Sequence, residues 1–228
     1  MRASLRTELP HLAVIAAMFV LAAATWSAVP DRIPVHWDLA GRVDRYGGKF
    51  EGLLLMPLLT LGIYLLFLVA PRFDQGRSNY ARFWRPYWIM RLAAVVVLAL
   101  VYGFILLWTW GIQLDVWTVV PILVGGLFVV LGSVMGKIRP NWFVGIRTPW
   151  TLSSELSWTK THRLGGRLFV LVGIALLTSG FVGSTRDLLF GLAVVTGCVL
   201  WLLLYSYLVW RTDPEKISPS GMSPDDRE

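Results

Sequence analysis

Six long apolar runs alternate with polar segments along the chain, and each matches the roughly 20 residues that cross a ~30 Å hydrocarbon core as a helix. The runs cover residues 9–29, 52–70, 88–110, 116–136, 164–183 and 188–210. The pattern predicts an all-α integral membrane protein, a bundle of six transmembrane helices. Composition agrees, because 56% of the 228 residues are hydrophobic and only 15% are charged, far from the average of soluble domains.

The first run also resembles a secretory signal peptide, since Arg2 and Arg6 precede it and Ala22 begins a stretch of three alanines. It continues to Pro30, which is longer than the short apolar core of a signal peptide. We therefore expect a retained first helix, with cleavage as the alternative. In both cases the segment after it faces outward.

The distribution of basic residues predicts the orientation in the membrane. Of the 21 Lys and Arg, only five fall on one side of the alternating runs, namely Arg32, Arg42, Arg45, Lys49 and Arg186. The other 16 and both termini are therefore expected in the cytoplasm of a bacterial cell, with the protein in the cytoplasmic (inner) membrane. The net charge of +7 then reports membrane orientation rather than direct binding to nucleic acid.

Ionisable residues are sparse inside the runs. Arg91 lies about one turn from the cytoplasmic edge, where its side chain is expected to snorkel toward the headgroups. Without other charges in the middle of a run, ion-coupled transport is disfavoured. The single Cys198 excludes an intramolecular disulfide framework. Gly132 and Gly136 form a small-xxx-small pair that is expected to pack against another helix of the same bundle.

The outer segment, residues 30–50, is expected to form a small hairpin that caps the bundle. Asp38 and Gly41 fit the ends of a type I turn, and residues 42–44 form the return strand. Alternation places His36 and Asp38 on one face and Trp37 on the other. The candidate ligand-binding residues are His36, Trp37, Asp38, Asp44 and Lys49. These donors do not make a complete ligand set, so no metal is expected, and Trp37 and Tyr46 are interpreted as interfacial anchors.

The cytoplasmic segment, residues 137–167, is basic and rich in tryptophan. Pro140 and Pro149 interrupt it, and a short helix capped by Thr151 or Ser153 is expected to follow, with Glu155, Thr159 and His162 on one face. Catalysis by Glu155 and His162 is not favoured, since no nucleophile, metal set or glycine-rich phosphate loop accompanies them. No catalytic residue and no cofactor is predicted. The candidate partner-binding residues are Asn141, Trp142, Arg147, Trp150, Glu155, Trp158, His162 and Arg163.

Two motifs resemble known families. Residues 141–153, followed by Trp158, the run 160–163 and Gly165-Gly166, resemble the signature of the SdpI family of bacterial membrane proteins. Residues 33–38, with Gly41, Val43-Asp44 and residues 47–49, are similar to the uncharacterised DUF1648 domain. The expected organisation is a DUF1648-like region over 1–87, an SdpI-like region over 88–211 and a disordered cytoplasmic tail over 212–228.

The resemblance implies an immunity and signalling protein. It would protect its cell from a secreted toxic peptide at the outer face and hold an ArsR-type repressor at the inner face, with membrane lipids as its other partners. A transporter or flippase for a lipid-linked or amphipathic substrate is the first alternative, and a membrane-embedded enzyme that uses Glu155 and His162 is the second.

Overall fold

The computed structural model describes residues 5–182 and 185–216, and the side chains of residues 182–190 lie outside this description. Six of its helices are long and apolar enough to cross a membrane, so the predicted all-α fold is confirmed. They are α1 (Leu5–Thr25), α2 (Leu55–Phe73), α3 (Trp84–Thr109), α4 (Val116–Met135), α6 (Glu155–Val182) and α7 (Thr185–Arg211). The protein is a multi-pass membrane protein.

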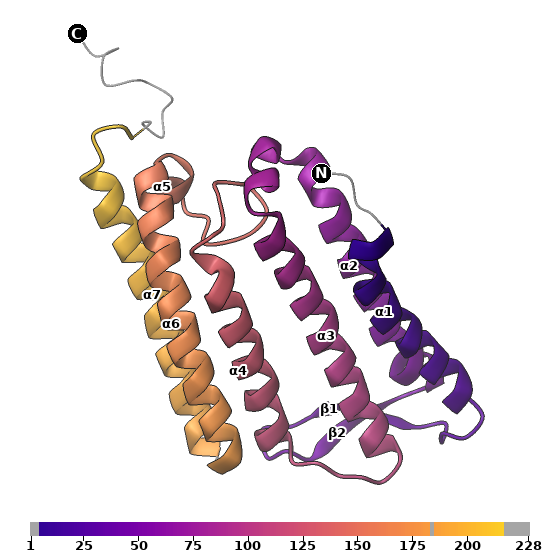
Figure 1. Ribbon diagram of the computed structural model, residues 1–228. Coiled ribbons are helices and arrows are strands. Elements are labelled where there is room, and N and C mark those ends of the chain that lie inside the picture. The colour runs from indigo at the N-terminus through magenta and orange to yellow at the C-terminus, as the bar shows by residue number, and fades with distance from the viewer. Residues whose placement is uncertain (1–4, 183–184, 217–228) are drawn as a thin grey trace.

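The helices run side by side, and the two ends of the bundle differ (Figure 1). One end carries the strands β1 (Ile33–Trp37) and β2 (Val43–Gly47), and we call it the hairpin end. The other end carries a 3₁₀ helix, η2 (Arg77–Arg82), the short helix α5 (Pro149–Leu152), the start of α1 and the end of α7. We call it the loop end.

The hairpin follows the predicted turn. Asp38 and Gly41 close it, since the Gly41 N–H donates to the Asp38 carbonyl at 2.9 Å, and Gly41 has φ +75°, which glycine adopts without steric cost. The strands pair antiparallel with an irregular register, and β2 begins one residue later than expected. Trp37 packs against Phe104 and Trp108 of α3, with ring centroids 5.0 and 5.5 Å away. It therefore attaches the hairpin to the bundle.

Two predicted boundaries are wrong. The fifth membrane helix begins at Glu155 and not at residue 164, so the expected separate short helix is the first part of α6. Its N-terminus is capped by Ser154, whose Oγ accepts from the Ser157 N–H at 2.9 Å, rather than by Thr151 or Ser153. The expected tail also begins too early, because Asp213 is buried and Lys216 lies over the Trp210 ring. Residues 217–228 lie outside the described part of the chain.

Helices α4 and α6 pack at backbone distance through glycines. A Cβ on Gly132 would lie 2.6 Å from the Gly166 carbonyl oxygen, and one on Gly125 would lie 2.7 Å from that of Gly173. Gly132 therefore packs inside the bundle as predicted, whereas a Cβ on Gly136 would meet Arg163 only at ordinary contact distance, 3.5 Å. Close approach of small residues is a main source of helix association in membranes, where the lipid supplies no hydrophobic driving force.

This packing makes Gly132→Ala a destabilising substitution. We expect it to lower the free energy of unfolding by about 1–3 kcal/mol, the usual cost of overpacking, because α4 and α6 must move apart. Gly126→Ala is the matched control in the same helix, since nothing lies within 4 Å of its added methyl group. Thermal unfolding of the purified variants in detergent measures both, and equal midpoints for the two would contradict the proposed contact.

Candidate functional site

At the loop end, the carboxylate of Asp74 joins two segments that are far apart in the sequence. It accepts hydrogen bonds from the Gly76 N–H at 2.6 Å, the Tyr80 hydroxyl at 2.7 Å and the Trp142 N–H at 3.0 Å. Burial and this carboxylate raise the pKa of the Tyr80 hydroxyl. Asp74 thus anchors the 137–154 segment to the end of α2. Its position in the sequence, four residues after the second apolar run, gave no sign of this role.

The side chain of Asn141 stabilises the turn in which the residue lies. Its Oδ1 accepts from the N–H groups of Phe143 and Val144, and its Nδ2 donates to the carbonyls of Arg139 and Val144. The side chain is buried. Its hydrogen-bonding capacity is therefore used within residues 139–144, which leaves it poorly placed for contact with a partner.

Trp158 and His162 form the interior of this end of the protein, and both are fully buried. Their rings stack with centroids 4.1 Å apart, and the Trp158 indole N–H donates to the Ile138 carbonyl at 2.9 Å. His162 Nε2 lies 3.0 Å from the Ile146 N–H, and its Nδ1 lies 2.8 Å from the Trp158 carbonyl oxygen. An N–H can only donate and a carbonyl can only accept, so the ring is neutral and carries its proton on Nδ1.

The geometry does not bring together Glu155 and His162, the pair on which the alternative of an enzyme depends. Glu155 is exposed at the first position of α6, whereas both ring nitrogens of His162 are occupied by backbone groups two turns further along. Within the described residues, no hydrogen bond or ion pair joins the two side chains. Glu155, Thr159 and His162 keep the expected helical spacing within α6, but the structure offers no acid–base pair to the alternative of an enzyme.

The short helix α5 fixes the rest of the segment onto α6 and α7. Thr148 and Thr151 form a reciprocal capping box at its N-terminus, and the Thr148 hydroxyl also lies 3.2 Å from that of Ser206 in α7. Ser154 donates to Asp213 just after α7. Trp150 packs edge-on against Tyr207, with centroids 5.3 Å apart, so it is partly used in packing.

Four of the eight predicted partner-binding residues are exposed, namely Trp142, Arg147, Glu155 and Arg163. Trp142 is 48% exposed, Phe143 lies beside it, and Arg147 is exposed while donating to the Trp142 carbonyl. Arg163 is exposed on α6. The expected contact set of Trp142, Trp150 and Trp158 with Arg147 thus needs correction, because the buried Trp158 belongs to the internal core. The accessible surface, which we call the Trp142 surface, consists of Trp142, Phe143 and Arg147.

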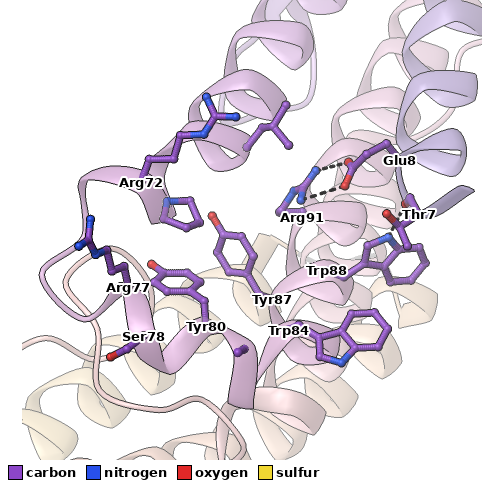
Figure 2. A pocket seen from close by; sticks show the side chains of 13 residues that line it. Thr7, Glu8, Arg72, Arg77, Ser78, Tyr80, Trp84, Tyr87, Trp88 and Arg91 are labelled. Carbon is purple, nitrogen blue, oxygen red and sulfur yellow. Dashed lines mark hydrogen bonds and ion pairs between the residues drawn. The ribbon is translucent and has the colours of Figure 1, made fainter. Parts of the chain in front are cut away.

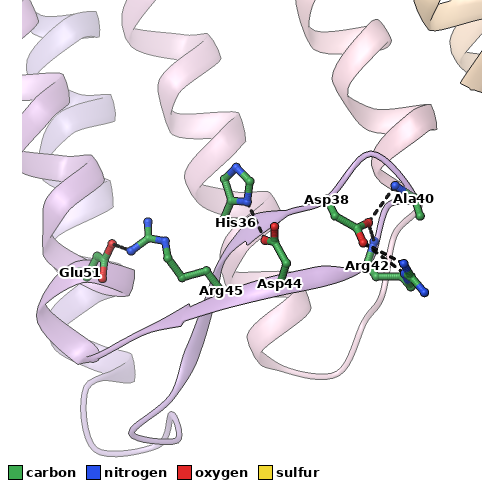
Figure 3. Close-up of polar contacts among 7 residues, drawn as sticks. All are labelled: His36, Asp38, Ala40, Arg42, Asp44, Arg45 and Glu51. Carbon is green, nitrogen blue, oxygen red and sulfur yellow. Dashed lines mark hydrogen bonds and ion pairs between the residues drawn. The ribbon is translucent and has the colours of Figure 1, made fainter.

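The hairpin residues form local pairs (Figure 3). His36 Nδ1 lies 2.6 Å from Asp44 Oδ1, and Asp38 Oδ1 accepts from the N–H groups of Ala40 and Arg42 at 2.8 and 2.9 Å. Hydrogen bonds from Arg42 and Ala40 lower the pKa of the Asp38 carboxyl. Asp38 therefore holds the turn, whereas His36 and Asp44 remain exposed.

Lys49 connects the hairpin to the end of α1. Its Nζ donates to the Trp26 carbonyl at 3.0 Å and lies 3.4 Å from Asp31. Among the described residues, no group of three or more His, Cys, Asp or Glu side chains could hold a metal ion. His36, Leu39, Asp44 and Tyr46 are among the exposed residues on this end.

A buried ion pair inside the bundle is the largest departure from the expectation. Arg91 of α3 pairs with Glu8 of α1 and is only 7% exposed, so it does not snorkel (Figure 2). The Tyr64 hydroxyl of α2 donates to the same carboxylate at 3.0 Å. His11 is fully buried next to them, 3.8 Å from Glu8. Three helices therefore meet at one polar cluster.

The signal for this cluster was present in the sequence. Glu8 stood one residue before the predicted first run and His11 near its start, so neither counted as lying in the membrane interior. Their spacing of three places both on one helix face. Arg91 lies at a similar depth from the same end of the bundle. Glu8 and Arg91 can therefore form an ion pair once α1 and α3 are adjacent.

Comparison with known proteins agrees with the multi-pass architecture and adds a family. Residues 137–209 match the SdpI/YfhL protein family, and residues 13–61 match a domain of unknown function, DUF1648. The resemblance expected from the sequence is therefore confirmed. The chain is 21% identical over 210 residues to the Immunity protein SdpI of Bacillus subtilis (strain 168), which covers 91% of this chain and 97% of that protein. No solved structure matches significantly.

Proposed function

We propose that this chain is an immunity protein of the bacterial cytoplasmic membrane that protects its cell from a secreted toxic peptide. The observation that carries the proposal is the similarity to the Immunity protein SdpI along nearly the whole length of both chains. A match of this length extends beyond either of the two segments that match family models. A shared function of the whole assembly is the simplest reason for keeping both specialised ends.

In this proposal the hairpin end faces outward. The excess of Lys and Arg belongs to segments at the loop end, and basic residues favour the cytoplasmic side. The hairpin then presents Leu39, 76% exposed, and Tyr46, 49% exposed, to a peptide arriving from outside. Exposed apolar and aromatic side chains are frequent anchors of protein interfaces, so protection would proceed by binding.

The Trp142 surface would serve the second role, holding a small ArsR-type repressor at the inner face. It combines an exposed tryptophan with an exposed arginine, the residue types that contribute most at interfaces. The bonds from Asp74 and Arg147 fix its backbone, so little conformational entropy would be lost on binding. The exposed Arg163 adds positive charge at this end.

The structure affects the two alternative functions, an enzyme and a transporter, in opposite ways. An enzyme based on Glu155 and His162 loses support, because the His162 ring is enclosed and its lone pair is engaged. A transporter of an amphipathic substrate is the second candidate function. The buried Glu8, His11 and Arg91 favour it, since ionisable groups inside membrane helices often mark transport pathways. Their presence also contradicts the expectation that the bundle holds no such groups, on which ion-coupled transport was disfavoured.

The test of the proposal uses a strain that lacks the gene, challenged with culture supernatant of its own kin. The strain should become sensitive to a secreted peptide, and a plasmid copy of the chain should restore growth. If the complemented cells hold the peptide at their membrane and not in the cytoplasm, binding explains protection better than uptake does. Unchanged sensitivity to all kin supernatants on deletion would contradict the proposal.

A further inference from the structure

A cavity of about 510 Å³ opens at the loop end between α1, α2, η2 and α3. Figure 2 shows its walls, with Arg72 and Arg77 on one side, the paired Arg91 and Glu8 on the other, and the tyrosine rings between them. Its volume lies within the range of small-molecule sites. The proposed binding of a peptide at the hairpin and of a repressor at the Trp142 surface does not use it.

The charge of the lining is strongly positive. Three arginines, Arg72, Arg77 and Arg91, face a single carboxylate, that of Glu8. Glu8 is already paired with Arg91, and within the described residues no acidic side chain or carbonyl pairs with the guanidinium of Arg72 or Arg77. Two guanidinium groups are therefore free to bind an anion, and guanidinium is well suited to the oxygens of a phosphate.

The position of the cavity relates it to the membrane. Arg72 lies in the last turn of α2 and Trp84 is the first residue of α3, so the lining includes the ends of two membrane helices. Tryptophan and tyrosine favour this level, where headgroups meet the hydrocarbon core, and Tyr80, Trp84, Tyr87 and Trp88 all line the cavity. Leu68 and Pro71 add apolar surface on the side of α2.

We propose that this cavity binds the headgroup of an anionic phospholipid, with the phosphate between Arg72 and Arg77 and the first acyl carbons against Leu68 and the aromatic rings. The buried Glu8–Arg91 pair forms the inner wall of the cavity. The Glu8 carboxylate offsets the charge of Arg91, so the net positive charge of the lining comes from Arg72 and Arg77. The bound lipid would join α1, α2 and α3 at an end where Trp88 already donates to the Thr7 carbonyl at 2.7 Å.

The test uses the purified full chain in detergent, titrated with short-chain phosphatidylglycerol while the thermal unfolding midpoint is recorded. Phosphatidylglycerol should raise the midpoint, and phosphatidylcholine of the same chain length should do so much less, because its headgroup carries no net charge. Inorganic phosphate is the third probe, since it shares the phosphate chemistry without the acyl chains. Native mass spectrometry counts the lipids that stay bound.

Arg72→Gln/Arg77→Gln should weaken the apparent affinity for phosphatidylglycerol by about 30-fold, on the usual contribution of a basic residue near anionic lipid. Arg82→Gln/Lys160→Gln is the matched control, because it removes the same charge from two exposed residues outside the cavity. An equal loss in both double variants would show general surface attraction and overturn the site. A full midpoint shift with inorganic phosphate alone would overturn the lipid as its ligand.

Discussion

Arg91→Leu should lower the free energy of unfolding of the protein by about 3–5 kcal/mol, the range observed when one partner of a buried ion pair is removed. The substitution leaves the Glu8 carboxylate buried, with the Tyr64 hydroxyl as its remaining hydrogen-bond donor. A charge in that setting must either stay unpaired in a medium of low dielectric constant or take up a proton, and both outcomes cost free energy. Unfolding in detergent, followed by tryptophan fluorescence, measures the loss.

The double variant Glu8→Leu/Arg91→Leu separates the ion pair from simple loss of packing. We expect it to be more stable than Arg91→Leu alone, because replacing a whole buried pair by apolar residues is often close to neutral. Arg85→Leu, at an exposed position of the same helix, should change stability by less than about 1 kcal/mol. Losses that simply add in the double variant would show that the two charges do not interact.

Gly145→Ala should be the most damaging single substitution in the SdpI-type segment. Gly145 has φ +108°, a backbone conformation that alanine rarely adopts, and an added Cβ would lie 2.3 Å from His162 Nε2. The methyl group would displace the imidazole from the Ile146 N–H and leave that partly buried donor without its partner. We expect a loss of about 2–4 kcal/mol, which combines backbone strain with a broken, partly buried hydrogen bond.

A second substitution distinguishes the two causes of this loss. Gly145→Ala/His162→Ala removes the steric conflict but keeps the strained φ at position 145. Its loss of unfolding free energy should therefore equal the loss of His162→Ala plus the cost of the strained backbone, with no further contribution from the clash. Gly48→Ala is the control glycine, since nothing lies within 4 Å of its added methyl group and its φ is not in the strained range. If Gly145→Ala unfolds at the same temperature as Gly48→Ala, the contact between Gly145 and His162 is not as described.

The sequence predicted those features that depend on local pattern. Apolar run length was enough to find six membrane helices, and the Asp38 to Gly41 spacing was enough to find the hairpin turn. The start of α6 was missed because Lys160, His162 and Arg163 interrupt the apolar pattern of a membrane helix. Trp158 and His162 nevertheless bury this part of the helix against the 137–154 segment. Hydropathy alone does not show which side chains a loop encloses.

The candidate site was only partly predictable for the same reason. The signature residues Asn141, Trp158 and His162 were interpreted as contacts for a partner, yet their hydrogen bonds show that they build the loop that presents Trp142 and Arg147. The Glu8–Arg91 pair joins residues 83 positions apart, so only the packing of α1 against α3 reveals it. Pairing across helices is tertiary information, which no periodicity along one helix contains.

The most direct test of the central claim measures protection by the exposed hairpin face. Cells that lack the gene and express His36→Ala/Tyr46→Ala from a constitutive promoter are compared with cells that express the parent or Trp142→Ala, at matched membrane levels. We predict that the hairpin variant needs about 30-fold less peptide to stop growth, since an interface anchor such as Tyr46 contributes roughly 2 kcal/mol or more, while Trp142→Ala protects like the parent. Full protection by the hairpin variant, with loss of protection in Trp142→Ala, would contradict recognition of the toxic peptide at the hairpin end.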